Sequence, residues 1–451
     1  MLLCAQYIVP VVGAPFQNGA VLVRDGKICD IGDSEMLRLR YPEEQRIDYG
    51  RAALMPGFID LQTHLENSVM RGTIKDGSYT QWLRALRDTS TKLSARDWYA
   101  SSVLGGLEAL TNGITCVADI SSTGASCSAM QKLGLRGVVY RSVGAMDRRL
   151  VRRAIDNAEN DVVRWSESVD SDRIKVGVAP RESYMCHPEI YTLAANLARR
   201  EGVPLSITIG GSYEEARFIR FGASNLSVAN MTDRHGYVEI PPWLPTGVSP
   251  VRYILNWGAF EADNVMAAHC VHVEDEDINK LKEYDVAVAM CPRCNAQLGM
   301  GMAPLRDFIR SGLRVGLGTG YTAAIDATDM IAETRIAMLL HRALNPGRFI
   351  SADDMLRLCT IEAARALHME DQVGSIEVGK LADLVVIDLS GSHQAPSDDP
   401  VFAIVSTCTG GDILMTMVGG EIRYEKDRWN VDIEVARDIA RVIEIRGKLR
   451  G

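Results

Sequence analysis

Long apolar runs are missing from this sequence of 451 residues. No uninterrupted apolar run approaches the roughly 18 residues that a membrane-spanning helix needs, so we expect no membrane anchor. The segment from Met1 to Gln6 has no basic residue, which argues against a secretory signal peptide. Aromatic residues are few at 6%, but 47% hydrophobic and 24% charged residues are typical of a globular protein. Disordered and collagen-like chains are therefore excluded.

Positive charge and paired cysteines are also scarce. The 49 Lys and Arg residues are outnumbered by 58 Asp and Glu residues, and the net charge of −9 gives no electrostatic basis for binding nucleic acid. The 10 cysteines mostly stand singly inside apolar segments, which indicates buried thiols in a reducing cytoplasm. Only Cys291 and Cys294 lie close in sequence, and packing explains them better than zinc or redox chemistry. We expect a cytoplasmic protein whose partner is a small-molecule substrate.

Short apolar segments alternate with helical patterns from residue 54 onward, as in repeated βα units. Helix boundaries are marked by a capping box at Ser94 and Asp97, by Ser249 and Pro250 at a helix start, and by Gly202 at a helix end. We expect eight parallel strands, at 54–60, 114–120, 136–142, 174–180, 204–209, 264–269, 286–290 and 314–318. Eight such strands with helical connections predict an α/β fold, a (β/α)8 TIM barrel.

The two ends of the chain do not follow this alternation. Residues 1–53 predict a small antiparallel sheet with a turn at Asp25 and Gly26, and strand patterns return in 371–430. We expect these two parts to form one small β-sandwich domain beside a barrel that spans 54–370. Residues 431–451 predict a C-terminal helix.

Polar residues stand where several of the predicted barrel strands end, which is where active sites of such barrels lie. The first strand is followed by Gln62 and His64, which point the same way because side chains alternate along a strand. Others come at the ends of strands four, five and six: Arg181, Glu182, Thr208 and His269.

Six motifs occur in one order along nearly the whole chain: 55–60, 70–72, 268–272, 291–295, 316–319 and 374–384. Together they resemble the amidohydrolase superfamily, most closely its branch of S-adenosylhomocysteine and adenosine deaminases, chlorohydrolases and guanine deaminases. The resemblance implies a barrel with a flanking β-domain. It also implies a homodimer or a higher homo-oligomer, since oligomers are common in that family.

The resemblance implies a divalent metal held by a His-x-His pair on strand one, a His on each of strands five and six, and an Asp on strand eight. In this sequence Gln62 replaces the first histidine, Thr208 the strand-five histidine and Gly320 the aspartate. Only His64 and His269 remain. Because a catalytic zinc site normally uses three firm protein ligands, we expect no metal and no other cofactor.

The loss of the metal limits the reaction. Zinc lowers the pKa of bound water from about 15.7 to about 7, which corresponds to roughly 12 kcal/mol of nucleophile activation. A positioned general base supplies only about 3–5 kcal/mol. The family's proton-transferring glutamate is also missing, since Gly211 stands at its position. We therefore expect an easier step: elimination, cyclisation, or hydrolysis of an electrophilic imine or amidine.

New functional groups stand near the predicted site. Glu66 is a candidate acid or base, or a solvated loop carboxylate. Arg181 replaces a substrate-binding histidine of the family and suggests a carboxylate or phosphate on the ligand, or else an ion pair with Glu182. Tyr321 can reach the space of the missing aspartate or fill it. Trp243, in a long connection at 222–247, can stack on a ligand ring or pack a dimer contact.

Three hypotheses follow. The first is a metal-independent enzyme that performs acid–base chemistry on a small nitrogen-containing molecule, in secondary metabolism among other settings. Its expected catalytic residues are His64, His269 and Glu66, and its expected substrate-binding residues are Gln62, Arg181, Glu182, Thr208, Asn295, Tyr321 and Trp243. The second is a non-catalytic ligand-binding or regulatory protein, and the third is a weakly metallated deaminase or chlorohydrolase. The polar residues retained at the strand ends favour the first.

Overall fold

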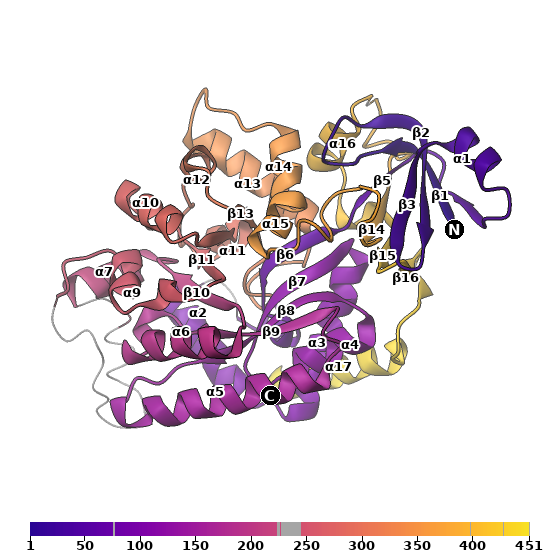
Figure 1. Cartoon of the computed structure of the whole chain (residues 1–451). Helices are drawn as coiled ribbons and strands as arrows, with labels where there is room; N and C mark the ends of the chain where they lie inside the picture. The colour runs from indigo at the N-terminus through magenta and orange to yellow at the C-terminus, as the bar shows by residue number, and fades with distance from the viewer. Residues whose placement is uncertain (75–76, 223–225, 227–244, 397, 427, 451) are drawn as a thin grey trace.

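The computed structural model describes residues 1–451 except 75–76, 223–225, 227–244, 397, 427 and 451. Two sheets organise this part of the chain, one of eight strands and one of nine. Figure 1 shows the eight-stranded sheet at the centre of the molecule. The other sheet lies to one side, where the indigo N-terminal strands meet the orange and yellow C-terminal ones.

The eight-stranded sheet is parallel, and its strands follow one another in sequence order. They are β6 (Phe58–Thr63), β7 (Ile114–Ser121), β8 (Arg136–Val143), β9 (Ile174–Pro180), β10 (Leu205–Ile209), β11 (Val265–His269), β12 (Ala287–Met290) and β13 (Val315–Leu317). A parallel bridge between Thr63 and Gly320 joins the first strand to the segment after the last. The sheet is thus a nearly closed barrel, and the predicted TIM-barrel fold is confirmed.

Helices connect and cover the barrel strands. They are α2 (Tyr79–Ser90), α3 (Ala95–Thr111), α4 (Ala125–Leu133), α5 (Arg148–Ser168), α6 (Glu189–Glu201), α7 (Tyr213–Phe221), α9 (Pro250–Asn256), α10 (Asp275–Glu283), α11 (Pro292–Gln297), α12 (Leu305–Ser311), α13 (Met330–Leu344), α14 (Ala352–Leu358) and α15 (Ile361–Ala366). The capping box at Ser94 and Asp97 begins α3 as predicted. No helix in the described part of the chain has the length and apolarity to cross a membrane.

The prediction of a single first strand over 54–60 is wrong in detail. The chain divides at Gly57, so that β5 (Ala52–Pro56) joins the nine-stranded sheet and β6 begins the barrel. The Gly57 N–H donates to the carbonyl of Asp383, and a Cβ at this glycine would lie 2.2 Å from Cγ2 of Thr115. A continuous apolar run therefore conceals a junction between two sheets, which periodicity alone does not reveal.

The nine-stranded sheet is mixed and combines both ends of the chain, as predicted. It contains β1 (Leu2–Ile8), β2 (Phe16–Arg24), β3 (Lys27–Asp33), β4 (Arg46–Asp48), β5, β14 (Leu384–Asp388), β15 (Ile413–Val418), β16 (Glu421–Glu425) and β17 (Arg428–Trp429), with α1 (Ser34–Arg40) and α16 (Pro400–Ser406) in its connections. Asp25 and Gly26, both with positive φ, form the predicted hairpin turn. A core of its own lies among β1, β2, β5, β14 and β15.

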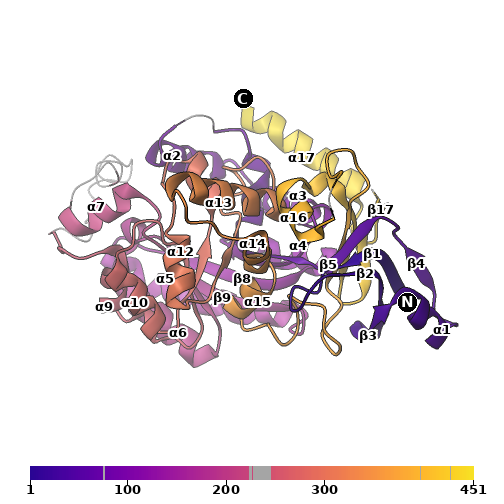
Figure 2. The same ribbon diagram turned by 90° about the horizontal axis from the view of Figure 1, so that it is seen from above.

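A buried ion pair attaches this domain to the barrel. Arg136, the first residue of β8, donates from Nε to Asp383 Oδ2 at 2.7 Å and from Nη2 to Oδ1 at 3.2 Å. Asp383 directly precedes β14. The β-domain is thereby fixed at the amino ends of the barrel strands, opposite to the ends where barrel active sites lie. The predicted C-terminal helix is α17 (Val435–Arg450), which packs against α3 (Figure 2).

Candidate active site

A cavity of about 230 Å³ opens at the carboxyl ends of β7 to β10. Its polar and charged lining comes mostly from the strand ends and from the loop after β6, with two residues of α2: His64, Glu66, Asn67, Arg87, Ser90, Ser122, Ser142, Arg181, Glu182, Ser206, Thr208 and Tyr321. Its apolar side is formed largely by α2, α3 and the segment after β9, with Leu83, Leu86, Trp98 and Met185. The cavity therefore has one polar and one apolar side, as small-molecule sites commonly have.

His64 forms part of the cavity wall and stacks on Tyr321, with 4.4 Å between ring centroids and 14° between the planes. Burial, together with the charges of His269 and Arg181, lowers the pKa of His64 to about 3. The imidazole is therefore neutral at physiological pH. The neutral ring can accept a hydrogen bond or a proton from a molecule in the cavity.

Tyr321 is buried, and its hydroxyl donates to Glu182 Oε1 at 2.5 Å. Beside this pair, the hydroxyls of Tyr79 and Tyr184 are hydrogen-bonded to each other. Burial and the charge of Glu182 raise the pKa of Tyr321, so its hydroxyl stays protonated and remains a donor. The phenol thus fixes the position of a cavity-lining carboxylate.

Glu66 also touches the cavity, but its carboxylate is fully engaged elsewhere. It accepts hydrogen bonds from Ser121 Oγ at 2.5 Å, from the Ser122 N–H at 2.9 Å, and from the Thr123 N–H and Oγ1 at 3.1 and 2.6 Å. These four donors hold the loop after β7 against the loop after β6. The geometry favours a structural role for Glu66 rather than the acid–base role expected from its position.

Arg181 and Thr208 both lie where the sequence predicted, on the cavity wall. The Arg181 guanidinium donates to Ser142 Oγ at 3.0 Å and to Ser122 Oγ at 3.4 Å. It is not paired with the adjacent Glu182 among the described residues. The alternative of a simple ion pair between these neighbours is therefore wrong, and Arg181 remains a candidate for binding an anionic group.

His269, Gln62 and Asn295 are fully buried and are not part of the cavity lining. His269 Nδ1 lies 2.7 Å from Asn295 Oδ1, which can only accept, so Nδ1 carries the proton and Nε2 has a free lone pair. That Nε2 atom, Nε2 of His64 and both amide atoms of Gln62 are buried without a partner in the described structure. Asn295 therefore orients His269 rather than contacting a ligand in the cavity.

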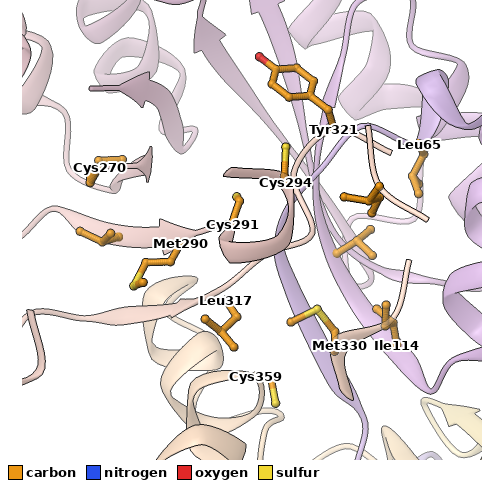
Figure 3. Close-up of a cluster of buried hydrophobic side chains, with 14 of the residues drawn as sticks. Leu65, Ile114, Cys270, Met290, Cys291, Cys294, Leu317, Tyr321, Met330 and Cys359 are labelled. Carbon is orange, nitrogen blue, oxygen red and sulfur yellow. The ribbon is translucent and has the colours of Figure 1, made fainter. Parts of the chain in front are cut away.

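The segment after β13 closes the barrel at the position of the family's acidic ligand. Gly320 has φ +75°, and its N–H donates to the Gln62 carbonyl at 2.6 Å. A Cβ at Gly320 would lie 2.8 Å from Cβ and 3.0 Å from Sγ of Cys294. Figure 3 shows Cys291 and Cys294, at and near the start of α11, close to Tyr321 within a cluster of buried side chains. All ten cysteines are free thiols, and this pair is used for packing, as predicted.

The residues present do not fit a catalytic zinc ion. Two imidazoles remain of the ligand set, and both the left-handed backbone and the close contact with Cys294 disfavour an aspartate at Gly320. Among the residues that the structure describes, no group of three or more His, Cys, Asp or Glu side chains is arranged to hold a metal ion. The amide of Gln62 is a weaker ligand than the imidazole that the family carries there.

Sequence reasoning did not identify the apolar wall contributed by α2 and α3. Leu83, Leu86 and Trp98 line the cavity from these helices, and Tyr79 joins the hydroxyl cluster near Glu182. The helical spacing of Tyr79, Leu83 and Leu86 was the available signal, because it marks one face of α2 as apolar. Trp243, predicted to bind substrate, lies outside the described residues.

Comparison with known proteins identifies the family. The model of the amidohydrolase family matches residues 53–423, and the chain belongs to this family. A model described as an imidazolonepropionase-like composite domain of bacteria matches residues 19–43. The chain is 32% identical over 428 residues to a 5-methylthioadenosine/S-adenosylhomocysteine deaminase of Symbiobacterium thermophilum, covering 93% of this chain and 92% of that protein. A deaminase of the same description from Caldanaerobacter subterraneus is 31% identical over 385 residues, covering 84% and 83%.

Solved structures agree on the fold. An adenosine deaminase from Xanthomonas campestris with bound zinc superposes with a TM-score of 0.86 at 23% identity, covering 100% of this chain and 98% of that one. An atrazine chlorohydrolase from Arthrobacter aurescens complexed with zinc gives 0.83 at 21% identity, covering 99% of both chains. At these identities the likeness shows the barrel and its flanking domain, and the chemistry must be argued from the site.

Proposed function

We propose that this chain is an enzyme that acts on a C–N bond of a small nitrogen-containing molecule by acid–base chemistry, without a divalent metal ion. The observation that carries the proposal is the closed position at Gly320. Cys294 and the left-handed backbone disfavour an acidic ligand there, while a polar cavity persists at the strand ends. The relatives named as deaminases support a C–N bond as the target.

The two histidines supply the proton acceptors. His64 lines the cavity and is neutral at physiological pH, so it can accept a proton or a hydrogen bond from a ligand. The charge of His269 lowers the pKa of His64, and burial also lowers the pKa of His269 itself, against the opposing effect of its hydrogen bond to Asn295. His64 therefore contacts the ligand, and His269 lies behind it as a second neutral imidazole with a free Nε2 lone pair.

A general base supplies only about 3–5 kcal/mol, which suits an electrophilic substrate better than an unactivated amide. For an amidine, water adds to the amidine carbon and an imidazole takes the proton from that water. The departing amine takes up a proton as the C–N bond breaks, which leaves an amide. Cyclisation or elimination at a similar group would use the same acceptors.

Elemental analysis and turnover of a panel of amidines and imines, before and after treatment with a chelator, test the proposal. We expect substoichiometric zinc and iron, and turnover that the chelator does not change. His64→Ala and His269→Ala should each lower turnover by about 10²–10⁴-fold, the range of a lost general base. The control is His393→Ala, at an exposed histidine paired with Asp412. Stoichiometric metal whose removal abolishes turnover would overturn the proposal.

A further inference from the structure

Glu182 is a buried carboxylate on the wall of the cavity. Its residue is only 7% exposed, and the cavity provides that exposure. In the described structure its side chain has one hydrogen-bond partner, the hydroxyl of Tyr321 at 2.5 Å on Oε1. No cationic side chain of the described residues lies within ion-pair distance of it. Oε2 is therefore available to a molecule in the cavity.

Two other buried carboxylates of the described residues, those of Glu66 and Glu333, have several donors each. Glu66 accepts four hydrogen bonds from the loop after β7. Glu333 is fully buried and forms an ion pair with Arg293, with Nε to Oε2 at 2.9 Å, and accepts the Arg293 N–H at 2.7 Å. Glu182 differs from both because its only donor is one neutral hydroxyl. A buried carboxylate in that state is costly unless another donor or cation completes it.

We propose that Glu182 anchors a cationic nitrogen group of the ligand, of the planar amidinium type, through an ion pair at Oε2. The inference deepens the proposed function and rests on it, since it assigns a substrate class to the same cavity. An amidinium is a planar cation whose N–H groups donate short, charge-assisted hydrogen bonds to a carboxylate oxygen such as Oε2. The group is also the electrophile that metal-independent hydrolysis requires.

Tyr321 is the positioning residue in this arrangement. Its ring is fixed between His64, at a centroid distance of 4.4 Å, and Trp82, at 5.0 Å. Its hydroxyl therefore holds Oε1 of Glu182 from a defined direction and leaves Oε2 toward the cavity. The same ring places His64 beside the anchored group, so the cation and the proton acceptor would meet at one end of the cavity.

The rest of the cavity fits the remainder of such a ligand. Leu83, Leu86, Trp98 and Met185 form an apolar side suited to a ring or chain that carries the amidinium. Arg181 does not neutralise Glu182, because its guanidinium donates to Ser142 and Ser122 instead. The two charges are thus kept apart for separate parts of a ligand.

Binding of benzamidine, with its neutral analogue benzamide as the matched probe, tests this inference by calorimetry on the full chain. We expect the wild type to bind benzamidine at least about 10-fold more tightly than benzamide. Glu182→Gln should abolish this preference while retaining an acceptor for the Tyr321 hydroxyl. Tyr321→Phe should reduce it by about 3–10-fold, and Glu283→Gln, at an exposed helix position, should leave it unchanged.

Equal affinity of the wild type for both probes, or an undiminished preference in Glu182→Gln, would overturn the inference. The first of these results needs no variant, so a variant that fails to fold does not remove the test. Failure of the proposed function gives a different result. In that case the preference for benzamidine would persist, while turnover of amidines would depend on a stoichiometric metal.

Discussion

The ring of Tyr321 lies nearly parallel to the imidazole of His64, with 4.4 Å between their centroids. Gly320 stands at the position where the family carries its acidic metal ligand, and Tyr321 is the next residue. The space beside His64 is thus filled by an aromatic ring that also holds Glu182 through its hydroxyl. The residue after Gly320 thus contacts both His64 and Glu182.

Tyr321→Phe separates the two contacts of this residue. Phenylalanine keeps the stack on His64 but leaves Glu182 buried without its donor. We expect the free energy of unfolding to fall by about 1–3 kcal/mol, the range for an unsatisfied buried polar group. Thermal unfolding measures the change, with Tyr213→Phe, at a residue 60% exposed, as the control. Equal stability of Tyr321→Phe and wild type would show that the hydrogen bond contributes nothing.

Gly320→Asp tests whether the metal site can be restored. The matched control is Gly202→Asp, because Gly202 also has positive φ, +64°, but nothing lies within 4 Å of its Cβ position. We expect the control to lose about 1–2 kcal/mol from backbone strain. Gly320→Asp should lose a further 1–3 kcal/mol, roughly, because its Cβ overlaps Cys294. It should bind no stoichiometric zinc, and a stable, zinc-loaded variant would contradict this prediction.

The barrel was predictable because its signal is repeated. Eight apolar segments alternate with capped helices, and an error at one of them, the division at Gly57, does not change the fold. The division itself was not predictable, since β5 and β6 are both apolar and differ only in the sheet they join. Local pattern specifies the element, and only tertiary pairing specifies its sheet.

The site was predictable in position but not in the role of each residue. Sequence placed Glu66 and Glu182 at the carboxyl ends of the first and fourth barrel strands and assigned Glu66 to catalysis and Glu182 to substrate binding. The difference between them in the structure arises from partners that lie far away in sequence: Ser121 and Thr123 for Glu66, and Tyr321 for Glu182. Burial, which lowers the pKa of His64 to about 3, is likewise a property of the packed barrel. Roles that depend on the environment of a group therefore required the structure.

Glu66→Gln should affect stability and leave ligand binding intact. An amide can accept only through its oxygen, so part of the four-donor arrangement from Ser121 to Thr123 is lost. We expect the free energy of unfolding to fall by about 1–3 kcal/mol. The preference for benzamidine over benzamide should remain within about 2-fold of wild type. Glu276→Gln, at an exposed residue paired with Arg252, serves as the control. Loss of the preference in Glu66→Gln alone would assign the ligand contact to Glu66 instead.

The pH dependence of stability should reveal the raised pKa of Glu215. This residue is 1% exposed, and its carboxylate accepts hydrogen bonds from Ser183 Oγ at 2.9 Å and from the Gly211 N–H at 3.0 Å. Burial raises the pKa of this carboxyl to about 7, from an ordinary value of 4.5. Between these two values the folded state binds more protons than the unfolded state. The contribution of Glu215 to stability is therefore fully present below pH 4.5 and is lost as pH rises through 7.

Denaturant unfolding of wild type and Glu215→Gln across this range isolates the effect, because every other titrating group is common to both proteins. The stability of wild type relative to the variant should fall by up to about 3 kcal/mol between pH 4.5 and 7.5, at about 1.36 kcal/mol for each unit of pKa shift. Glu283→Gln, at a solvent-exposed carboxyl, should follow the wild-type profile. A pH-independent difference between wild type and Glu215→Gln would mean that this carboxyl is ionised in the folded protein at neutral pH. Its bonds to Ser183 and Gly211 would then outweigh the desolvation that raises its pKa.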